Sequence, residues 1–177
     1  MSETPDELRS RTDTESRTIV VLVDNEPGVL ARVIGLFSGR GYNIESLTVA
    51  EVDEANHISR ITIVTSGTPM VLEQIKAQLG RLVPVHRVSD LTREGAHVER
   101  ELALVKVRGS GDKRVEALRI ADVFGAEVVD TGLEHFVFQL TNRSDKIDAF
   151  IALMEPLGLT DLSRTGVVAI TRGSEGL

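Results

Sequence analysis

The feature that most constrains the fold is a single order of predicted elements, because the chain runs through it twice. In the first half, short runs of β-branched residues predict buried strands, and apolar residues spaced three and four apart predict amphipathic helices. In chain order, the pattern predicts a strand at 18–23, a helix from Val29, strands at 42–52 and 58–65, a helix after Pro69 and a strand at 82–88. This β-α-β-β-α-β order is that of the ferredoxin-like module, in which two helices cover one face of a four-stranded antiparallel sheet.

The second half follows the same order after a polar stretch. The pattern there predicts a strand at 102–107, a helix at 115–124, a hairpin from 128–129 and 136–140, a helix at 147–154 and a closing strand within 159–170. Phe37 and Phe124 each fall in the last turn of a first helix with glycine close behind, which supports an internal repeat. We therefore expect an α+β protein with two ferredoxin-like βαββαβ modules in tandem, each of about 75 residues, whose small size favours pairing of sheets for extra stability.

Polar stretches set the expected boundaries of these modules. Residues 1–17 are mostly charged or polar and predict a disordered tail. Residues 91–100 mix charges with one glycine and predict a linker, so the modules are expected at 18–90 and 101–173. The tail lacks the apolar segment of a secretory signal, and no run approaches the roughly 20 apolar residues of a membrane span. We expect a cytoplasmic protein that makes no membrane contact.

Composition argues against several functions. The chain has no cysteine, which excludes disulfides, thiolate metal sites and thiol nucleophiles. It carries 27 acidic and 20 basic residues and only 3% aromatic residues on which bases could stack, so nucleic acid is not an expected partner. Its four histidines show no metal-ligand spacing or triad partner, and we interpret them as surface or linker residues. Gly109-Ser-Gly111 lacks the third glycine of a dinucleotide fingerprint and predicts a turn. We therefore expect neither catalytic residues nor a metal site.

The stretch that points to binding is the loop Asp24-Asn-Glu-Pro-Gly28, between the first predicted strand and the first predicted helix. The start of a helix presents unpaired backbone N–H groups and the positive end of the helix dipole, which suit a small carboxylate. Gly28 lets a ligand approach the backbone, and Asn25 offers donor and acceptor groups for an α-ammonium and an α-carboxylate. On the residues alone, a simple turn at a helix start remains the commoner interpretation of such a loop.

Two segments make the chain identifiable. Asn25-Glu-Pro-Gly-Val-Leu30 resembles the strand-to-helix loop of ACT domains, which are βαββαβ modules that bind amino acids in metabolic enzymes. The run from Arg32 to Ala50, RVIGLFSGRGYNIESLTVA, resembles the regulatory (small) subunit of acetohydroxyacid synthase, also called acetolactate synthase. Further agreement comes from the stretches 71–79, 95–102 and 163–168. The resemblance covers nearly the whole chain except its tails.

The resemblance implies where an effector would bind. In this family, two ACT domains associate side by side, and the amino-acid effector lies at their interface, held by the first loop of one chain and the start of the second strand of the other. The matching residues are Asn25, Gly28, Val29 and Leu30 in the loop, and Asn43 and Ile44 in the strand. Asn43 would supply polar groups and Ile44 an apolar wall, so the site is expected to be incomplete in a monomer. The second module lacks the loop motif, and no amino-acid site is transferred to it.

The resemblance also implies a function. It predicts a regulatory subunit that binds the acetolactate synthase catalytic (large) subunit, raises its activity and confers feedback inhibition by valine or another branched-chain amino acid. The catalytic partner would carry thiamine diphosphate, Mg²⁺ and FAD, and this chain would carry no cofactor. The alternative is a stand-alone ACT protein that senses an amino acid without a catalytic partner.

Overall fold

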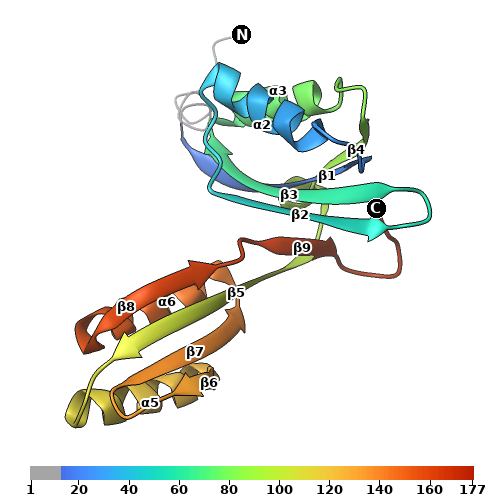
Figure 1. The fold of residues 1–177 in the computed structure, drawn as a ribbon. Coiled ribbons are helices and arrows are strands. Elements are labelled where there is room, and N and C mark those ends of the chain that lie inside the picture. The colour runs from blue at the N-terminus through green and yellow to red at the C-terminus, as the bar shows by residue number, and fades with distance from the viewer. Residues whose placement is uncertain (1–12) are drawn as a thin grey trace. The chain divides into compact units, whose positions relative to one another are not determined.

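The structure, a computed structural model, describes residues 13–177 and divides the chain into two compact units. The N-terminal module comprises the described residues up to Val98 together with Ala169–Leu177, and the C-terminal module comprises Glu99–Val168. Each unit is a sheet with helices (Figure 1). Most of the predicted tail, residues 1–12, lies outside the described residues, but the first strand already begins at Glu15, within that predicted tail.

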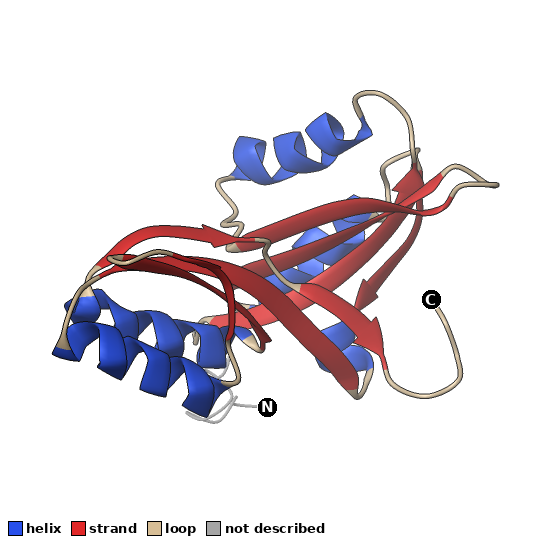
Figure 2. Ribbon diagram, turned by 60° about the horizontal axis from the view of Figure 1, so that its bottom comes forward, coloured by secondary structure: helices blue, strands red, loops and turns tan. Residues whose placement is uncertain are grey.

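The N-terminal module has the predicted order of elements. Its elements are β1 (Glu15–Asp24), α2 (Val29–Arg40), β2 (Ser46–Asp53), β3 (Ile58–Gly67), α3 (Pro69–Leu79), β4 (Val85–Asp90) and α4 (Leu91–Glu94). The strands form one antiparallel sheet in the order β2-β3-β1-β4. Figure 2 shows the two long helices of this module side by side against one face of the sheet. The ferredoxin-like prediction is confirmed for this half.

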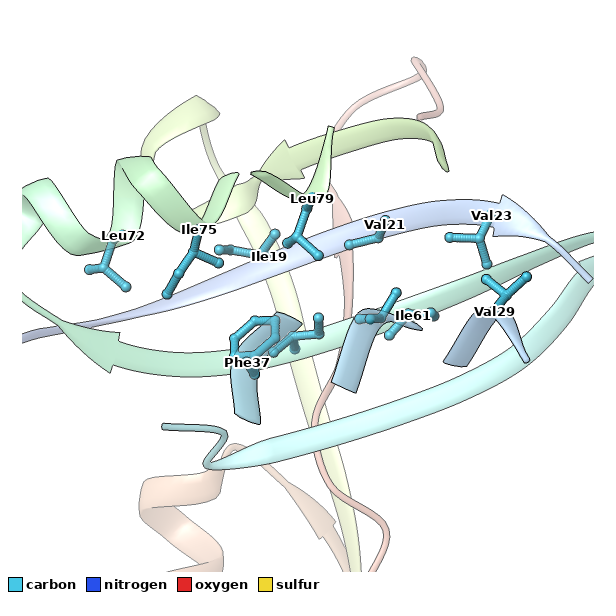
Figure 3. Packing of buried hydrophobic residues seen from close by; sticks show 11 residues of the cluster. Ile19, Val21, Val23, Val29, Phe37, Ile61, Leu72, Ile75 and Leu79 are labelled. Atoms are coloured by element: carbon cyan, nitrogen blue, oxygen red, sulfur yellow. The ribbon is translucent and has the colours of Figure 1, made fainter. Parts of the chain in front are cut away.

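The core of this module lies between the sheet and the two long helices (Figure 3). Alternate residues of β1 point towards the helices, and α2 and α3 place apolar side chains against them at three- and four-residue steps. The buried members, each at most 4% exposed, are Ile19, Val21, Val23, Val29, Val33, Phe37, Ile61, Ile63, Leu72, Ile75 and Leu79. These contacts fix the position of α2, and therefore of the loop before it.

Residues 91–100, predicted as a linker, form regular structure instead. Asp90 caps the short helix α4 by accepting hydrogen bonds from two of its N–H groups. Leu91 is 1% exposed because it packs with Val20, on the face of the sheet away from α2 and α3. The strand β5 (His97–Arg108) then begins inside the same stretch. Residues 91–100 are mostly polar, so their composition alone did not predict the buried side chain of Leu91 or the helix cap at Asp90.

The end of the chain returns to the N-terminal module. The closing strand predicted within 159–170 is two strands, β8 (Leu159–Arg164) and β9 (Val168–Thr171). The second of these pairs with β5, and Ala169 and Leu177 join the apolar cluster around Leu91. The Arg60 guanidinium donates to the Ala169 carbonyl at 2.7 Å, and burial lowers the pKa of this arginine. The last residues of the chain thus cover part of the first sheet.

The C-terminal module repeats the arrangement of the first. After β5 it contains α5 (Asp112–Phe124), β6 (Glu127–Thr131), β7 (His135–Asn142), α6 (Ser144–Met154), the 3₁₀ turn η1 (Glu155–Leu157) and β8. Its antiparallel sheet order, β6-β7-β5-β8, matches that of the N-terminal module strand for strand. Phe136 and Phe138 are buried in its core, and the ring of Phe138 meets that of Phe150 edge-on, with centroids 6.1 Å apart. The prediction of two tandem ferredoxin-like modules is confirmed.

The structure corrects the pairing of Phe37 with Phe124 in this repeat. Each first helix ends at a glycine in the left-handed conformation, and the residue after it donates its N–H to a carbonyl four residues before the glycine. That carbonyl belongs to Phe37 in α2 and to Ala121 in α5. Phe37 therefore corresponds to Ala121, and an aromatic residue near a glycine was not enough to fix the register.

The N-terminal module buries a cluster of charged side chains. Arg17, which was predicted to lie in the tail, is 2% exposed. Its guanidinium contacts the carboxylates of Glu15, Glu73 and Asp90. Hydrogen bonds from Arg17 and Arg93 hold the pKa of Glu15 below its usual value. The cluster joins β1, α3 and the end of β4.

The C-terminal module has a similar cluster, in which only Glu101 is buried. The Arg164 guanidinium contacts Glu101 at 2.8 Å and Asp148 at 2.7 Å. Glu101 is 4% exposed and also accepts a hydrogen bond from the Ser144 hydroxyl at 2.9 Å. The hydrogen bonds from Arg164 are the main reason that the pKa of Glu101 lies below its usual value. This cluster joins β5, α6 and the end of β8.

Candidate functional site

The loop between β1 and α2, residues 24–28, is held by two backbone hydrogen bonds. The Asn25 N–H donates to the His57 carbonyl at 2.7 Å, in the turn between β2 and β3, and the Asp24 N–H donates to the Pro84 carbonyl at 2.9 Å, just before β4. Gly28 ends the loop at φ 87°, a left-handed conformation that other residues rarely adopt. No atom would lie within 4 Å of a Cβ at Gly28, so the loop is open to a ligand at this point.

The first turn of α2 differs from those of the other long helices in the described chain. No side chain caps it, and it holds no acidic residue. By contrast, Thr68 caps α3, and Asp112 and Asp145 lie in the first turns of α5 and α6. Val29 is buried in the core, whereas Leu30 is 38% exposed and places an apolar side chain beside the turn. The Val29 N–H already donates to the Glu26 carbonyl at 3.3 Å, so a carboxylate bound here would face the N–H groups that follow it and the positive end of the helix dipole.

The other two predicted site residues lie between α2 and β2. The Asn43 side chain donates to the Ser66 hydroxyl at 3.4 Å, and the Asn43 carbonyl accepts a hydrogen bond from the Thr65 hydroxyl at 2.5 Å. Asn43 is exposed, whereas Ile44 is half-buried and packs against the core. The structure therefore presents a polar amide next to an apolar side chain at this position.

A single chain does not bring the two halves of the predicted site together. At one end of the β1–β3 ladder, Asp24 pairs with Ile58; at the other end, Ser16 pairs with Ser66, which accepts the hydrogen bond from Asn43. Eight strand positions separate Ser16 from Asp24, about 26 Å at roughly 3.3 Å per residue. A free amino acid is much shorter than this distance, so it cannot touch both halves in one chain.

The sequence gives no sign that a further residue, His86, lies beside the loop. The Nε2 atom of His86 lies 2.5 Å from a carboxylate oxygen of Asp24, the residue before Asn25. The histidines of this chain were interpreted as surface or linker residues, because their spacing matched no known site. No periodicity could have revealed this contact, since an irregularity in the pairing of β1 with β4 creates it.

The C-terminal module does not repeat the sequence of the loop or the acid-free helix start. Its first helix carries Asp112 in the first turn, and that charge would repel a ligand carboxylate. Among residues 13–177, no group of three or more His, Asp or Glu side chains could hold a metal ion. In the same part of the chain, no helix is long and apolar enough to cross a membrane.

Comparisons with known proteins give the family. A family model described as the AHAS small subunit-like ACT domain matches residues 19–87, and one described as the small subunit of acetolactate synthase matches residues 100–173. The acetolactate synthase isozyme 3 small subunits of Salmonella typhimurium and Escherichia coli are 49% and 48% identical over 160 residues, covering 90% of this chain and 97% of theirs. A crystal structure of the acetolactate synthase small subunit from Thermotoga maritima matches with a TM-score of 0.81 and 35% identity, over 91% of this chain and 99% of that one. This chain therefore belongs to the family of acetolactate synthase small subunits.

Proposed function

We propose that this chain is the regulatory subunit of acetolactate synthase, and that it binds a branched-chain amino acid in a site shared by two copies of itself. Binding would pass a signal to the catalytic subunit, which the chain also activates. Family membership supports the regulatory role. The observation that carries the shared site is the separation of loop 24–28 from Asn43, at opposite ends of one sheet.

The edge strand β2 supports a way of placing the second copy. This strand ends the sheet order β2-β3-β1-β4, so one side of its backbone has no neighbouring strand in the described chain. Two β2 strands related by a two-fold axis run antiparallel, which brings the start of one beside the end of the other. The start follows Asn43 and Ile44, and the end lies on the side of the sheet that carries loop 24–28. Pairing through β2 would therefore assemble the site twice in each dimer.

The residues of the two halves suit the chemistry of a free amino acid. Its carboxylate would face the first turn of α2 beside Gly28, and the Asn43 amide of the second copy would supply polar contacts. Leu30 and the second copy's Ile44 would surround the ligand side chain. Because one methylene is worth about 1–3 kcal/mol in an apolar pocket, valine, leucine and isoleucine should bind with graded affinities.

Regulation then requires that the effector bind one arrangement of the two copies more tightly than another. A ligand that binds both arrangements equally shifts no equilibrium, and couplings of this kind are typically about 1–3 kcal/mol. A ligand that bridges two chains is sensitive to their spacing, because a small displacement breaks contacts on both sides. We place thiamine diphosphate, Mg²⁺ and FAD on the catalytic subunit, as the resemblance implies, so this chain acts on the reaction only through that subunit.

Two substitutions test the site in the enzyme reconstituted from both subunits. Gly28→Asp puts a carboxylate beside the ligand carboxylate, and Asn43→Ala removes the polar groups of the other half. We expect each variant to raise the inhibiting concentration of valine by about tenfold or more, while activation of the catalytic subunit is kept. Titration of valine against enzyme activity measures both quantities.

Gly111→Asp is the matched control for the first substitution. Gly111 precedes α5 as Gly28 precedes α2, it also has a positive φ, 58°, and no atom would lie within 4 Å of its Cβ. This variant should keep both activation and inhibition. Unchanged inhibition in both Gly28→Asp and Asn43→Ala would move the effector site elsewhere. A wild-type chain that binds valine but never a thiamine-dependent subunit would favour a stand-alone amino-acid sensor.

A further inference from the structure

His86 reaches loop 24–28 because of an irregularity in the first sheet. Along β1 and β4, Leu22 pairs with Arg87, but the next residue of β1, Val23, pairs with Val85. His86 is therefore an extra residue in β4, which makes a β-bulge. Bulges of this kind redirect a side chain and are common beside functional sites.

The redirected ring contacts the carboxylate at the start of the loop. His86 Nε2 lies 2.5 Å from Asp24 Oδ1, and both side chains are partly exposed, at 51% and 38%. The Asp24 carboxylate does not cap α2, since no side chain does.

The C-terminal module has the same bulge with a different side chain. Lys106 pairs with Asp161, and the next residue of β5, Val107, pairs with Leu159. The extra residue of β8 is therefore Thr160, at the position that corresponds to His86 in β4.

The backbone bonds of the first loop are also repeated in this second module. The Arg108 N–H donates to the Gly158 carbonyl at 2.8 Å, and the Gly109 N–H donates to the Glu134 carbonyl at 2.9 Å. These bonds correspond to those of Asp24 and Asn25. The Thr160 hydroxyl, however, donates to the main-chain carbonyl of β5, and Arg108 pairs with Glu134 instead. The same backbone therefore forms without a contact between the bulge and the first residue of the loop.

We propose that His86 is a positioning residue for effector binding: its ring holds the Asp24 carboxylate away from the first turn of α2 and leaves that turn to the carboxylate of the bound amino acid. This inference rests on the proposed function, because it concerns the same site. A carboxylate near an uncapped helix start is attracted by unpaired N–H groups and by the helix dipole. An unrestrained Asp24 therefore competes with the ligand for that turn.

Calorimetric titration of valine into the full chain tests the inference. His86→Thr introduces the residue that the C-terminal module has at its bulge. This variant should bind valine about two- to fivefold more weakly than wild type. Asp24→Asn combined with His86→Thr removes the competing charge and should bind within about twofold of wild type. Thr160→Ala, the control at the second bulge, should match wild type.

Two results would overturn the inference. One is equal affinity of His86→Thr and wild type, and the other is a double variant as weak as His86→Thr alone. Thermal melting of each variant shows whether a loss of affinity reflects unfolding. If His86→Thr melts early, Asp24→Asn alone decides the question, because a loss of affinity in this variant contradicts a competition between the Asp24 carboxylate and the ligand. A wild-type chain that binds none of valine, leucine and isoleucine contradicts the proposed function instead, so the two failures are distinguishable.

Discussion

The two modules place an ion cluster, built on a buried residue of the first strand, at the same three points of the fold but exchange the signs of two of the charges. The corresponding residues are Arg17 and Glu101 on the first strands, Glu73 and Asp148 on the second helices, and Asp90 and Arg164 at the ends of the fourth strands. The register establishes this correspondence, since in each module the fourth-strand member faces the residue two positions after the first-strand member. The arginine thus lies on the first strand in one module and on the fourth in the other.

This exchange shows that the fold needs opposite charges at these points and not a given sign at each. The attraction within a pair is unchanged when both signs are reversed, whereas a buried charge without a partner is costly. What the modules share is backbone geometry: the strand order, the bulge between first and fourth strands, and the glycine that ends the first helix. The difference that bears on function lies in the first turn of the first helix, which has no acidic residue in α2 but has Asp112 in α5.

The largest effect is expected from removing the arginine of the N-terminal module. Arg17→Met leaves the Asp90 carboxylate, 1% exposed, without its cation, and an uncompensated buried charge costs about 3–5 kcal/mol. Urea denaturation should show this loss in the free energy of unfolding. Arg17→Met with Asp90→Asn should recover most of it. A double variant no more stable than the single one would show that the cluster stabilises by packing and not by charge.

A smaller effect is expected from the corresponding change in the C-terminal module. The Arg164 side chain is 32% exposed, against 1% for Arg17, so water can solvate Arg164 when a partner is lost. Glu101→Gln should therefore cost about 1–2 kcal/mol near neutral pH, measured by the same denaturation. Equal losses for this variant and Arg17→Met would contradict the view that exposure decides the cost.

The pH dependence of stability tests the contribution of the C-terminal cluster separately from that of the N-terminal cluster. Hydrogen bonds from Arg164 lower the pKa of Glu101 in the folded protein below its usual value of 4.5. A depressed carboxyl pKa stabilises the fold above the unfolded-state value and loses that contribution as the pH falls through the folded-state value. The free energy of unfolding, measured from about pH 7 to about pH 3, should therefore fall more steeply in wild type than in Glu101→Gln. If the free energies of unfolding of the two proteins change with pH in parallel, Glu101 does not contribute to the acid sensitivity of the fold.

The smallest effect on stability is expected at the glycines that end the two first helices, where the modules have the same backbone. Gly41 and Gly125 end α2 and α5 at φ 67° and 68°, and no atom would lie within 4 Å of a Cβ at either. Alanine at each position should cost about 1 kcal/mol, because only the left-handed backbone opposes it. Thermal denaturation should show equal losses for the two variants. Unequal losses would mean that the two helix ends are not equivalent in energy.

Much of the fold could be predicted because each long helix buries one stripe and each sheet packs against two helices. The helix predicted from Val29 begins at that residue, since Pro27 and Gly28 separate it from the strand before. The tail, the linker and the closing strand were misplaced for one shared reason. Arg17 is a charged residue, Leu91 lies in a polar stretch and Ala169 is a small residue, and segments that are distant in the sequence bury all three.

Some features of the candidate site depend on local sequence, and others depend on how distant segments of the chain pair. The loop from Asn25 to Leu30 is a contiguous motif, so its position at a helix start could be found from the sequence. The distance between this loop and Asn43 follows from strand register, which hydrophobic periodicity does not specify. His86 depends on a bulge, and one extra residue in a strand leaves no mark on an apolar pattern as short as that of β4.

The N-terminal module includes residues from the end of the chain, and this affects the order in which the protein can fold during translation. Domains generally fold in the order in which a ribosome produces them. Here Val20, on the first strand, is covered by Ala169 and Leu177, which emerge only after the entire second module. The N-terminal module therefore keeps Val20 partly uncovered until its own last segment has been translated, after the C-terminal module.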